Sequence, residues 1–219
     1  MNPEKLKTEL THRLNYYSKY HCRQFIECEE LFENQKGHLS IFYLFSLLEN
    51  VIKSTLNDFD STSFTLIQQL NNTSIINKKE TDFLNSQSNG IRRLRNIFAH
   101  ANLSKFDLKI NDQQVTYPLI ENETCLLLYE MVSPIISGII LKVLDPILEN
   151  DDNLDMTVLI NLLDYEIIER SPEQLLEFKG MSAELFNGWE ELDESTKYRL
   201  VENSPSADIL SGILRNLNL

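Results

Sequence analysis

The stretch Ile91–Leu103 reads IRRLRNIFAHANL and combines apolar side chains at helical spacing with a dense group of cationic and polar ones. On an ideal helix of about 3.6 residues per turn, four apolar side chains fall within roughly 80° of one another: Leu84, Ile91, Leu94 and Phe98. The opposite arc carries four polar side chains: Arg92, Arg93, Asn96 and His100. Arg95 lies at the boundary between the two arcs. This pattern predicts a helix that docks through one face and presents a histidine among guanidinium groups and an amide.

The polar face carries residue types that suit chemistry on a phosphodiester. A histidine exchanges a proton near neutral pH, and a guanidinium makes bidentate hydrogen bonds to phosphate oxygens and stabilises their charge. Asn96 precedes His100 by one turn, so it could orient the imidazole or a substrate. Arg95 and His100 are five residues apart, roughly 140° on an ideal helix, and therefore point in different directions. A second copy of the helix across a two-fold axis would unite them more easily than one chain could.

The run Arg95–His100 reads RNIFAH and resembles the R-N-x-x-x-H motif of the HEPN superfamily. Members of this superfamily are all-helical ribonuclease and nucleotide-binding domains of prokaryotic toxins and defence systems. The resemblance covers about residues 1–148 and leaves the C-terminal third unexplained. It implies a short helical bundle in which two protomers pair, so that their motifs form one composite cleft. It also implies RNA cleavage without a metal or another cofactor.

The resemblance implies a role for each motif residue. His100 would act as general base on a ribose 2′-hydroxyl, Arg95 would clamp the scissile phosphate, and Asn96 would position the substrate or the imidazole. Arg92 and Arg93 are candidate substrate-binding residues on the exposed arc. In-line attack by the 2′-oxygen would leave a 2′,3′-cyclic phosphate.

Two other interpretations of the motif stay open. The first is a non-catalytic module of the same fold, in which the arginines bind a nucleotide or an acidic partner. The intact pair of Arg95 and His100 favours the enzyme, because non-catalytic relatives often lose one of the two. The second is structural: His100 merely ends a helix, where the helix dipole favours a cation.

Glu49 is the one acid inside the predicted helix His38–Leu56, which is apolar on nearly every side. A charged group in such a position is usually paired. Its partner is either Lys53, one turn later, or a residue of the motif helix, which would be one of the arginines or His100. Some HEPN-like domains carry an acidic residue on the corresponding helix, and Glu49 is therefore a candidate supporting residue.

Composition restricts the partners and the compartment. The chain has 219 residues and a formal net charge of −13, which argues against a broad nucleic-acid-binding surface. RNA contact must then be local, at the cluster of Arg92, Arg93 and Arg95. No segment approaches the ~20 uncharged apolar residues of a membrane span, and the N-terminus lacks the apolar core of a secretory signal. Cys22, Cys28 and Cys125 form neither a disulfide framework nor a metal-ligand pair. We expect a cytoplasmic protein with idle or buried thiols and no metal.

The predicted fold class is all-α: an HEPN-like helical bundle over residues 1–148, with a small β-hairpin insertion. Pro3–Glu33 reads as one long helix, whose Tyr16, Tyr17 and Tyr20 favour core and groove packing over a base-stacking platform. Residues 81–100 form either one unbroken helix or one that restarts at Gly90. The hairpin comprises Phe106–Ile110 and Val115–Tyr117 around Asn111-Asp112. The bundle closes with Asn122–Leu148, which should bend near Pro134 and could end early at Pro146.

Residues 149–153 are polar and acidic and mark a boundary, beyond which residues 154–219 form a small helical subdomain. Its predicted helices are Met156–Glu169, Pro172–Phe178, Ser182–Glu191, Ser195–Asn203 and Ala207–Leu217. Ser171 and Ser182 read as helix caps, and Trp189 and Phe186 as core anchors. A unit of this kind is typical of partner docking or dimer stabilisation. The expected partners are RNA, a second copy of the chain, and an antitoxin or another defence-system protein.

Overall fold

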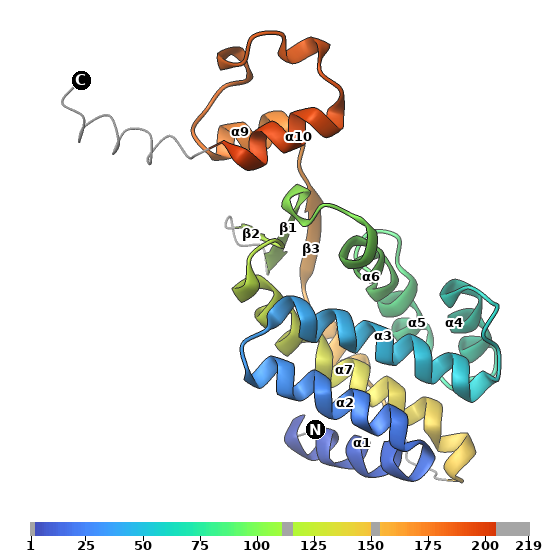
Figure 1. The fold of residues 1–219 in the computed structure, drawn as a ribbon. Helices are drawn as coiled ribbons and strands as arrows, with labels where there is room; N and C mark the ends of the chain where they lie inside the picture. The colour runs from blue at the N-terminus through green and yellow to red at the C-terminus, as the bar shows by residue number, and fades with distance from the viewer. Residues whose placement is uncertain (1–2, 111–115, 150–153, 205–219) are drawn as a thin grey trace.

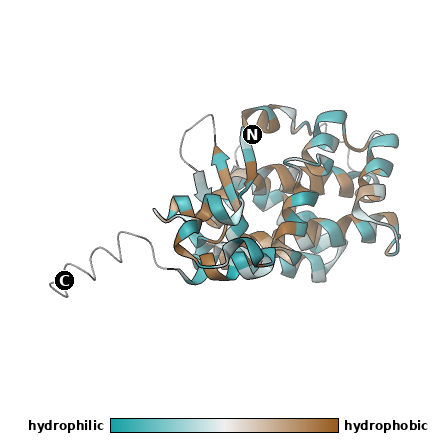
Figure 2. Cartoon of the chain, turned by 90° about the horizontal axis from the view of Figure 1, so that it is seen from above, coloured by the Kyte–Doolittle hydropathy of each residue, from teal (hydrophilic) through white to brown (hydrophobic). Residues whose placement is uncertain are grey.

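The computed structural model describes residues 3–110, 116–149 and 154–204 (Figure 1). This part of the chain is mostly helical, with 71 % helix, ten α-helices and one three-stranded sheet. The predicted helical class with a small hairpin is confirmed at this level. In the hydropathy-coloured view, hydrophobic and hydrophilic residues alternate along the helices, as expected for amphipathic elements packed around a common core (Figure 2).

The predicted N-terminal helix is wrong in one respect, because it is a pair of helices, α1 (Pro3–Tyr17) and α2 (Lys19–Glu33). Ser18 separates them with extended backbone angles, φ −158° and ψ 114°, and its hydroxyl accepts a hydrogen bond from the backbone N–H of His21. Serine at an N-cap satisfies a backbone donor that a new helix would otherwise leave unpaired. The two helices lie side by side and bury Leu10 and Phe25 (Figure 1).

The predicted packing of the N-terminal tyrosines is also wrong for two of the three. Tyr16 is 80 % exposed and Tyr20 is 63 % exposed, whereas Tyr17 is half-buried and shares a hydrogen bond with the hydroxyl of Ser54. The break at Ser18 changes the direction of the chain. An apolar stripe drawn along one continuous helix therefore gives the wrong burial for these side chains.

The centre of the bundle is a pair of apolar helices, α3 (Gly37–Leu56) and α7 (Asn122–Leu148). A side chain at Gly37 would overlap the backbone carbonyl oxygen of Asn122, so the glycine allows the two helix N-termini to touch. Helix α7 is continuous through Pro134 and Pro146 and does not end early.

Two described helices have the length and composition of a membrane span, although the sequence led us to expect no such segment. In α3, 44 % of the most apolar window is buried within the fold, and in α7 the share is 72 %. A helix that is apolar all round is expected at the centre of a bundle. The largely buried α7 fits a soluble protein.

Three short helices follow: α4 (Ser63–Asn72), α5 (Lys78–Asn85) and α6 (Ile91–His100). The motif helix restarts after Gly90, so Leu84 belongs to α5 and not to the predicted stripe. Helix α5 begins with a capping box in which Asn77 and Glu80 bond each other's backbone N–H groups.

The sheet has the order β2-β1-β3 and is antiparallel throughout, with β1 (Phe106–Ile110) at its centre. Strand β2 (Thr116–Pro118) completes the predicted hairpin, whose turn around Asn111-Asp112 lies outside the described residues. Leu108 of β1 pairs with residues of both neighbouring strands. The predicted helix Met156–Glu169 is wrong, because only Thr157–Leu162 (α8) is helical and Tyr165–Glu169 (β3) is a strand. Strand β3 contains adjacent β-branched residues and pairs with the second edge of β1.

The chain beyond β3 builds a separate small core from Leu176, Met181, Trp189 and Val201, with Phe186 packed against it. Helix α9 (Pro172–Phe178) and helix α10 (Glu194–Asn203) agree with the predictions. The predicted helix Ser182–Glu191 is wrong, because two 3₁₀ turns, Ala183–Leu185 and Trp189–Glu191, take its place. Ser171 and Ser182 are confirmed as caps. The predicted helix Ala207–Leu217 lies outside the described residues.

Candidate functional site

Helix α6 docks on the bundle through Ile91, Leu94 and Ile97, which are buried at steps of three residues. Phe98 is half-buried and meets Phe45 of α3 edge-on, with ring centroids 6.1 Å apart. The buried stripe of α6 therefore includes Ile97. Leu84, which the sequence assigned to this stripe, is buried on α5 instead, because the turn before Gly90 separates the two helices. Asn96 and His100 are exposed, as predicted for the polar arc.

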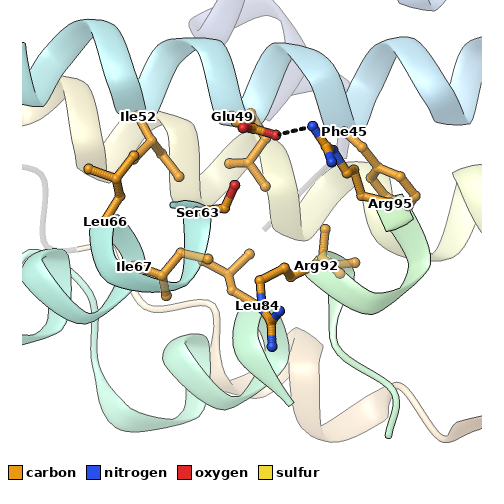
Figure 3. A pocket seen from close by; sticks show the side chains of 11 residues that line it. Phe45, Glu49, Ile52, Ser63, Leu66, Ile67, Leu84, Arg92 and Arg95 are labelled. Atoms are coloured by element: carbon orange, nitrogen blue, oxygen red, sulfur yellow. Dashed lines mark ion pairs between the residues drawn. The ribbon is translucent and has the colours of Figure 1, made fainter. Parts of the chain in front are cut away.

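Glu49 of α3 joins both of the partners that the sequence left open, and Figure 3 shows its contact with Arg95. Its Oε1 lies 2.9 Å from the Lys53 ammonium nitrogen, and its Oε2 lies 3.0 Å from a terminal nitrogen of Arg95. Burial opposes ionisation of this carboxyl group, but the hydrogen bond from Lys53 and the charge of Arg95 hold its pKa below the ordinary value. Glu49 therefore fixes Arg95 against α3 in an ionised pair.

Arg95 stands at the mouth of a narrow apolar pocket between α3, α4, α5 and α6 (Figure 3). The pocket has a volume of about 30 Å³. Its polar lining residues are Glu49, Ser63, Arg92 and Arg95, and the rest of the lining is aliphatic or aromatic. A second terminal nitrogen of Arg95 donates to the side-chain oxygen of Asn96 at 3.2 Å. The guanidinium thus bridges α3 and the exposed amide of the motif.

A shallow hollow of about 410 Å³ lies along the outer side of α6. It is lined by Gln87, Arg92, Arg93, Asn96, Ile97 and Ala101, and so contains no carboxylate. The Arg93 guanidinium donates to the carbonyl oxygen of Ser88, which holds it near the start of the helix. In a chain with net charge −13, this carboxylate-free hollow presents two guanidinium groups, a residue type that suits a phosphate or carboxylate ligand.

His100 lines a different cleft, of about 700 Å³, between the end of α6 and helix α10. Lys105 stands in this cleft 3.8 Å from the ring centroid of Tyr198 and 3.7 Å from a carboxylate oxygen of Glu194. Four carboxylates line the cleft: Glu169, Asp193, Glu194 and Glu202. Nothing in the sequence indicates that the C-terminal unit faces the motif histidine, because the contact depends on strand β3 pairing with β1.

The structure brings only part of the predicted site together within one chain. Arg92, Arg93 and Asn96 share the carboxylate-free hollow, which meets the His100 cleft at Ala101. Arg95 and His100, in contrast, line different pockets of the described chain. Their divergence on one helix agrees with the angle computed from the sequence.

Two residues that sequence reasoning missed complete the surroundings of Arg92. Its Nε donates to the side-chain oxygen of Asn85 on α5 at 3.2 Å, and its guanidinium carbon lies 5.5 Å from the ring centroid of Phe64 on α4. The sequence offered no signal for these contacts, since they join three helices that meet only in the folded chain.

The described residues contain no group of three or more His, Cys, Asp or Glu side chains that could hold a metal ion. The three cysteines are free and buried, and burial raises the pKa of Cys28 and of Cys125 to about 12. The expectation of buried thiols is confirmed. No protein-family model matches this chain, and neither a curated protein nor a solved structure matches it.

Proposed function

We propose that this protein is a metal-independent endoribonuclease of the HEPN type, a cytoplasmic toxin or antiviral defence component whose active site forms across a homodimer. One observation carries the proposal: an exposed histidine adjoins a hollow with two guanidinium groups, an amide and no carboxylate, on the helix that bears the R-N-x-x-x-H motif. The rest of the chain is strongly acidic, so this arrangement concentrates the local attraction for phosphate at the motif.

In the proposed reaction His100 removes the proton of a ribose 2′-hydroxyl, and the 2′-oxygen attacks the adjacent phosphorus. The bond from phosphorus to the 5′-oxygen breaks, which leaves a 2′,3′-cyclic phosphate and a 5′-hydroxyl. The 5′-oxygen takes its proton from the imidazolium of His100 in the second copy. Arg95 neutralises charge on the non-bridging oxygens, and Asn96 orients the phosphate or the imidazole.

The homodimer follows from the separation of Arg95 and His100 in one chain. Helices α3 and α6 run in opposite directions, since Phe45 packs on Phe98 and Glu49 on Arg95. Phe42 precedes Glu49 by seven residues and so projects within about 20° of it on α3. Leu39, Phe42 and Tyr43 are large apolar side chains left exposed on this helix. A two-fold contact through this face would cover them and bring each Arg95 toward the other protomer.

A second candidate function is a non-catalytic module that binds a nucleotide or an acidic partner. The contacts of Arg95 within the chain favour it. Its guanidinium is already engaged by Glu49 and Asn96, and the cleft of His100 carries four carboxylates. In this alternative the hollow around Arg92 and Arg93 is a binding surface only. The two functions make different predictions: only the ribonuclease cuts RNA, and its cleavage requires His100.

The test is incubation of purified protein with total RNA in EDTA. We expect the wild type to cut RNA and to leave 2′,3′-cyclic phosphate ends, and we expect His100→Ala and Arg95→Ala to be inactive with nearly unchanged thermal stability. His12→Ala, at an exposed histidine of α1, is the matched control and should cut normally. A wild type without activity, or cleavage that survives His100→Ala, would exclude the ribonuclease. If His100→Ala unfolds the protein, the histidine is structural.

A further inference from the structure

Phe64, Asn85 and Arg92 form a connected unit beside the motif helix, which we call the Phe64 platform. The side-chain nitrogen of Asn85 donates to the backbone carbonyl oxygen of Phe64 at 3.3 Å, and the Asn85 oxygen accepts from Arg92 Nε at 3.2 Å. The Arg92 guanidinium stands 5.5 Å from the Phe64 ring centroid. Asn85 is only 8 % exposed, so one buried amide fixes both the start of α4 and the guanidinium of α6.

The ring of Phe64 is not among the side chains that α4 buries. Helix α4 buries Leu66, Ile67 and Leu70 against the bundle, whereas Phe64 remains 50 % exposed. An aromatic ring that is half in solvent and has a fixed guanidinium over it provides a flat apolar surface next to a charge. That combination matches a nucleotide, which has a flat base and an anionic phosphate.

Arg92 keeps most of its donors for a ligand. A guanidinium has five N–H groups, and the bond to Asn85 uses only the one on Nε. No described residue accepts a hydrogen bond from the two terminal nitrogens. Arg92 also lines both the carboxylate-free hollow and the mouth of the pocket below Arg95. Its free N–H groups are therefore available to a phosphate bound in the carboxylate-free hollow.

We infer that the Phe64 platform binds one unpaired nucleotide of single-stranded RNA, with the base stacked on the Phe64 ring and a phosphate on Arg92. The identity of the ligand as RNA rests on the proposed function. Every base has a π-face, so the platform would select unpaired over paired RNA and not a particular sequence. In a duplex the bases are stacked on one another and cannot reach the ring. Phe64 and Arg92 are then substrate-positioning residues, while His100, eight residues and about 12 Å farther along α6, acts on a ribose farther along the strand.

The test measures binding without cleavage, with a fluorescently labelled 2′-O-methyl RNA strand that lacks the attacking hydroxyl. We expect Phe64→Leu, which keeps an apolar side chain but removes the ring, to weaken single-strand binding by about fivefold or more. Phe64→Trp should bind within twofold of wild type. A blunt RNA duplex should bind wild type and Phe64→Leu equally. Arg92→Ala should flatten the dependence of affinity on salt by about one phosphate contact.

The matched control is Phe178→Leu on α9. Phe178 is 66 % exposed and also has a guanidinium beside its ring, that of Arg170 at 5.8 Å, but it lies on the C-terminal unit. Its replacement should leave RNA binding unchanged. Equal losses for Phe178→Leu and Phe64→Leu, or a Phe64→Leu affinity within twofold of wild type, would overturn the platform. A loss that Phe64→Trp does not restore would also overturn it.

Failure of the platform and failure of the ribonuclease are distinguishable. Suppose that the wild type cuts RNA in a His100-dependent way, while Phe64→Leu binds the probe normally and cuts with an unchanged KM. The platform is then refuted and the ribonuclease proposal is supported. If the wild type does not cut RNA but Phe64→Leu binds the single-stranded probe more weakly than wild type, the ribonuclease proposal is refuted and the platform is supported.

Discussion

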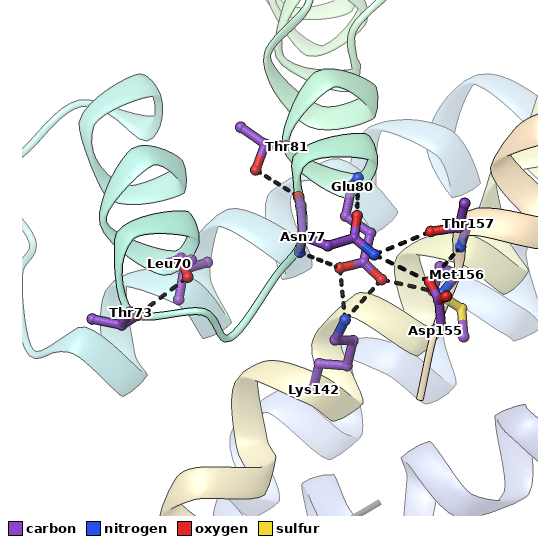
Figure 4. Close-up of polar contacts among 9 residues, drawn as sticks. All are labelled: Leu70, Thr73, Asn77, Glu80, Thr81, Lys142, Asp155, Met156 and Thr157. Carbon is purple, nitrogen blue, oxygen red and sulfur yellow. Dashed lines mark hydrogen bonds and ion pairs between the residues drawn. The ribbon is translucent and has the colours of Figure 1, made fainter. Parts of the chain in front are cut away.

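The Lys142 ammonium nitrogen lies 2.9 and 2.7 Å from the two carboxylate oxygens of Glu80, in an ion pair whose carboxylate has no exposed surface (Figure 4). Glu80 also accepts hydrogen bonds from the backbone N–H groups of Asn77 and Met156. The three donor groups on this carboxylate therefore lie in different parts of the chain: the N-cap of α5, helix α7 and the segment before α8. A buried charge with such a complete set of partners organises the region around it.

Glu80→Gln should destabilise the protein strongly. The amide keeps the shape of the side chain but leaves Lys142 without its counter-charge, and removal of one partner of a buried pair costs about 3–5 kcal/mol. Urea unfolding would measure the loss. Lys78→Met is the control, because Lys78 pairs with Asp82 in the same helix at the surface and should change the free energy of unfolding by less than about 1 kcal/mol. Similar losses for both variants would contradict the organising role of Glu80.

Glu49 should couple energetically to Arg95 as well as to Lys53. A double-mutant cycle of Glu49→Gln with Arg95→Ala, scored on stability and on RNA cleavage, should show coupling on both scales. The same cycle with Lys53→Met should show coupling in stability only. Zero coupling to Arg95 on both scales would leave Glu49 outside the site.

The Glu49 pair also predicts a pH dependence. The pKa of Glu49 is lowered in the folded state, so the stability that it contributes is present above its ordinary value of 4.5 and is lost as the pH falls further. The difference in unfolding free energy between wild type and Glu49→Gln should be constant near pH 7 and shrink below about pH 4.5. A difference that grows on acidification would show that folding raises the pKa of Glu49 and does not lower it.

Phe42→Glu should break the homodimer. We expect the wild type to be a dimer at micromolar concentration by light scattering, and the variant to be a monomer without ribonuclease activity although His100 is untouched. Thermal stability of the monomer should change little, since Phe42 is already 40 % exposed in one chain. A wild type that is monomeric at this concentration would remove the composite site but not the fold.

Glu194→Gln should strengthen RNA binding. The carboxylate faces the His100 cleft and pairs with Lys105, so its removal relieves repulsion of phosphate and frees a cation. Two unit charges about 7 Å apart in water interact by ~0.6 kcal/mol, which predicts roughly a threefold gain at low salt. The gain should vanish near 1 M salt, where the screening length is about 3 Å. Glu30→Gln on α2, which does not line the cleft, should have no effect; an equal gain there would indicate that only net charge matters.

The cysteines should resist alkylation in the native state. The thiolate is the reactive form, and burial raises the pKa of Cys28 and Cys125 to about 12 and also raises that of Cys22. Iodoacetamide at pH 8 should label the native protein slowly and the urea-unfolded protein completely, as seen by mass spectrometry. Rapid native labelling of any of the three would show that the bundle opens locally.

The features that could be predicted from the sequence are those set by local pattern. The helix His38–Leu56 is apolar on nearly every side, and this alone predicts its central position. The caps Ser171 and Ser182 follow from residue type and spacing. Lys53 and an arginine of the motif helix were predicted as alternative partners of Glu49, because one lies a helical turn away and a charge in an apolar helix is usually paired; the structure has both.

The features that could not be predicted depend on distant parts of the chain. Tyr165–Glu169 becomes a strand because β1 offers an unpaired edge, a tertiary effect that overrides the helical spacing before it. The break at Ser18 is invisible to periodicity, because one residue changes the chain direction without interrupting the apolar steps. Within the candidate site, the motif residues were visible, whereas Phe64 and Asn85 depend on where α4 and α5 pack.

Gly138 in the middle of α7 has a further consequence. Any side chain there would overlap the sulfur atom of Met156. The glycine therefore leaves a notch in α7, and the Met156 side chain fills it. Met156 also gives its N–H to Glu80 from this position. A fragment cut at Leu148 would leave the notch open and that carboxylate one bond short, and it would strip β1 of its long partner strand. The smallest piece of this chain that can be expected to fold by itself therefore extends at least to Arg170, which pairs with the buried Asp107 of β1, and not merely to the acidic stretch.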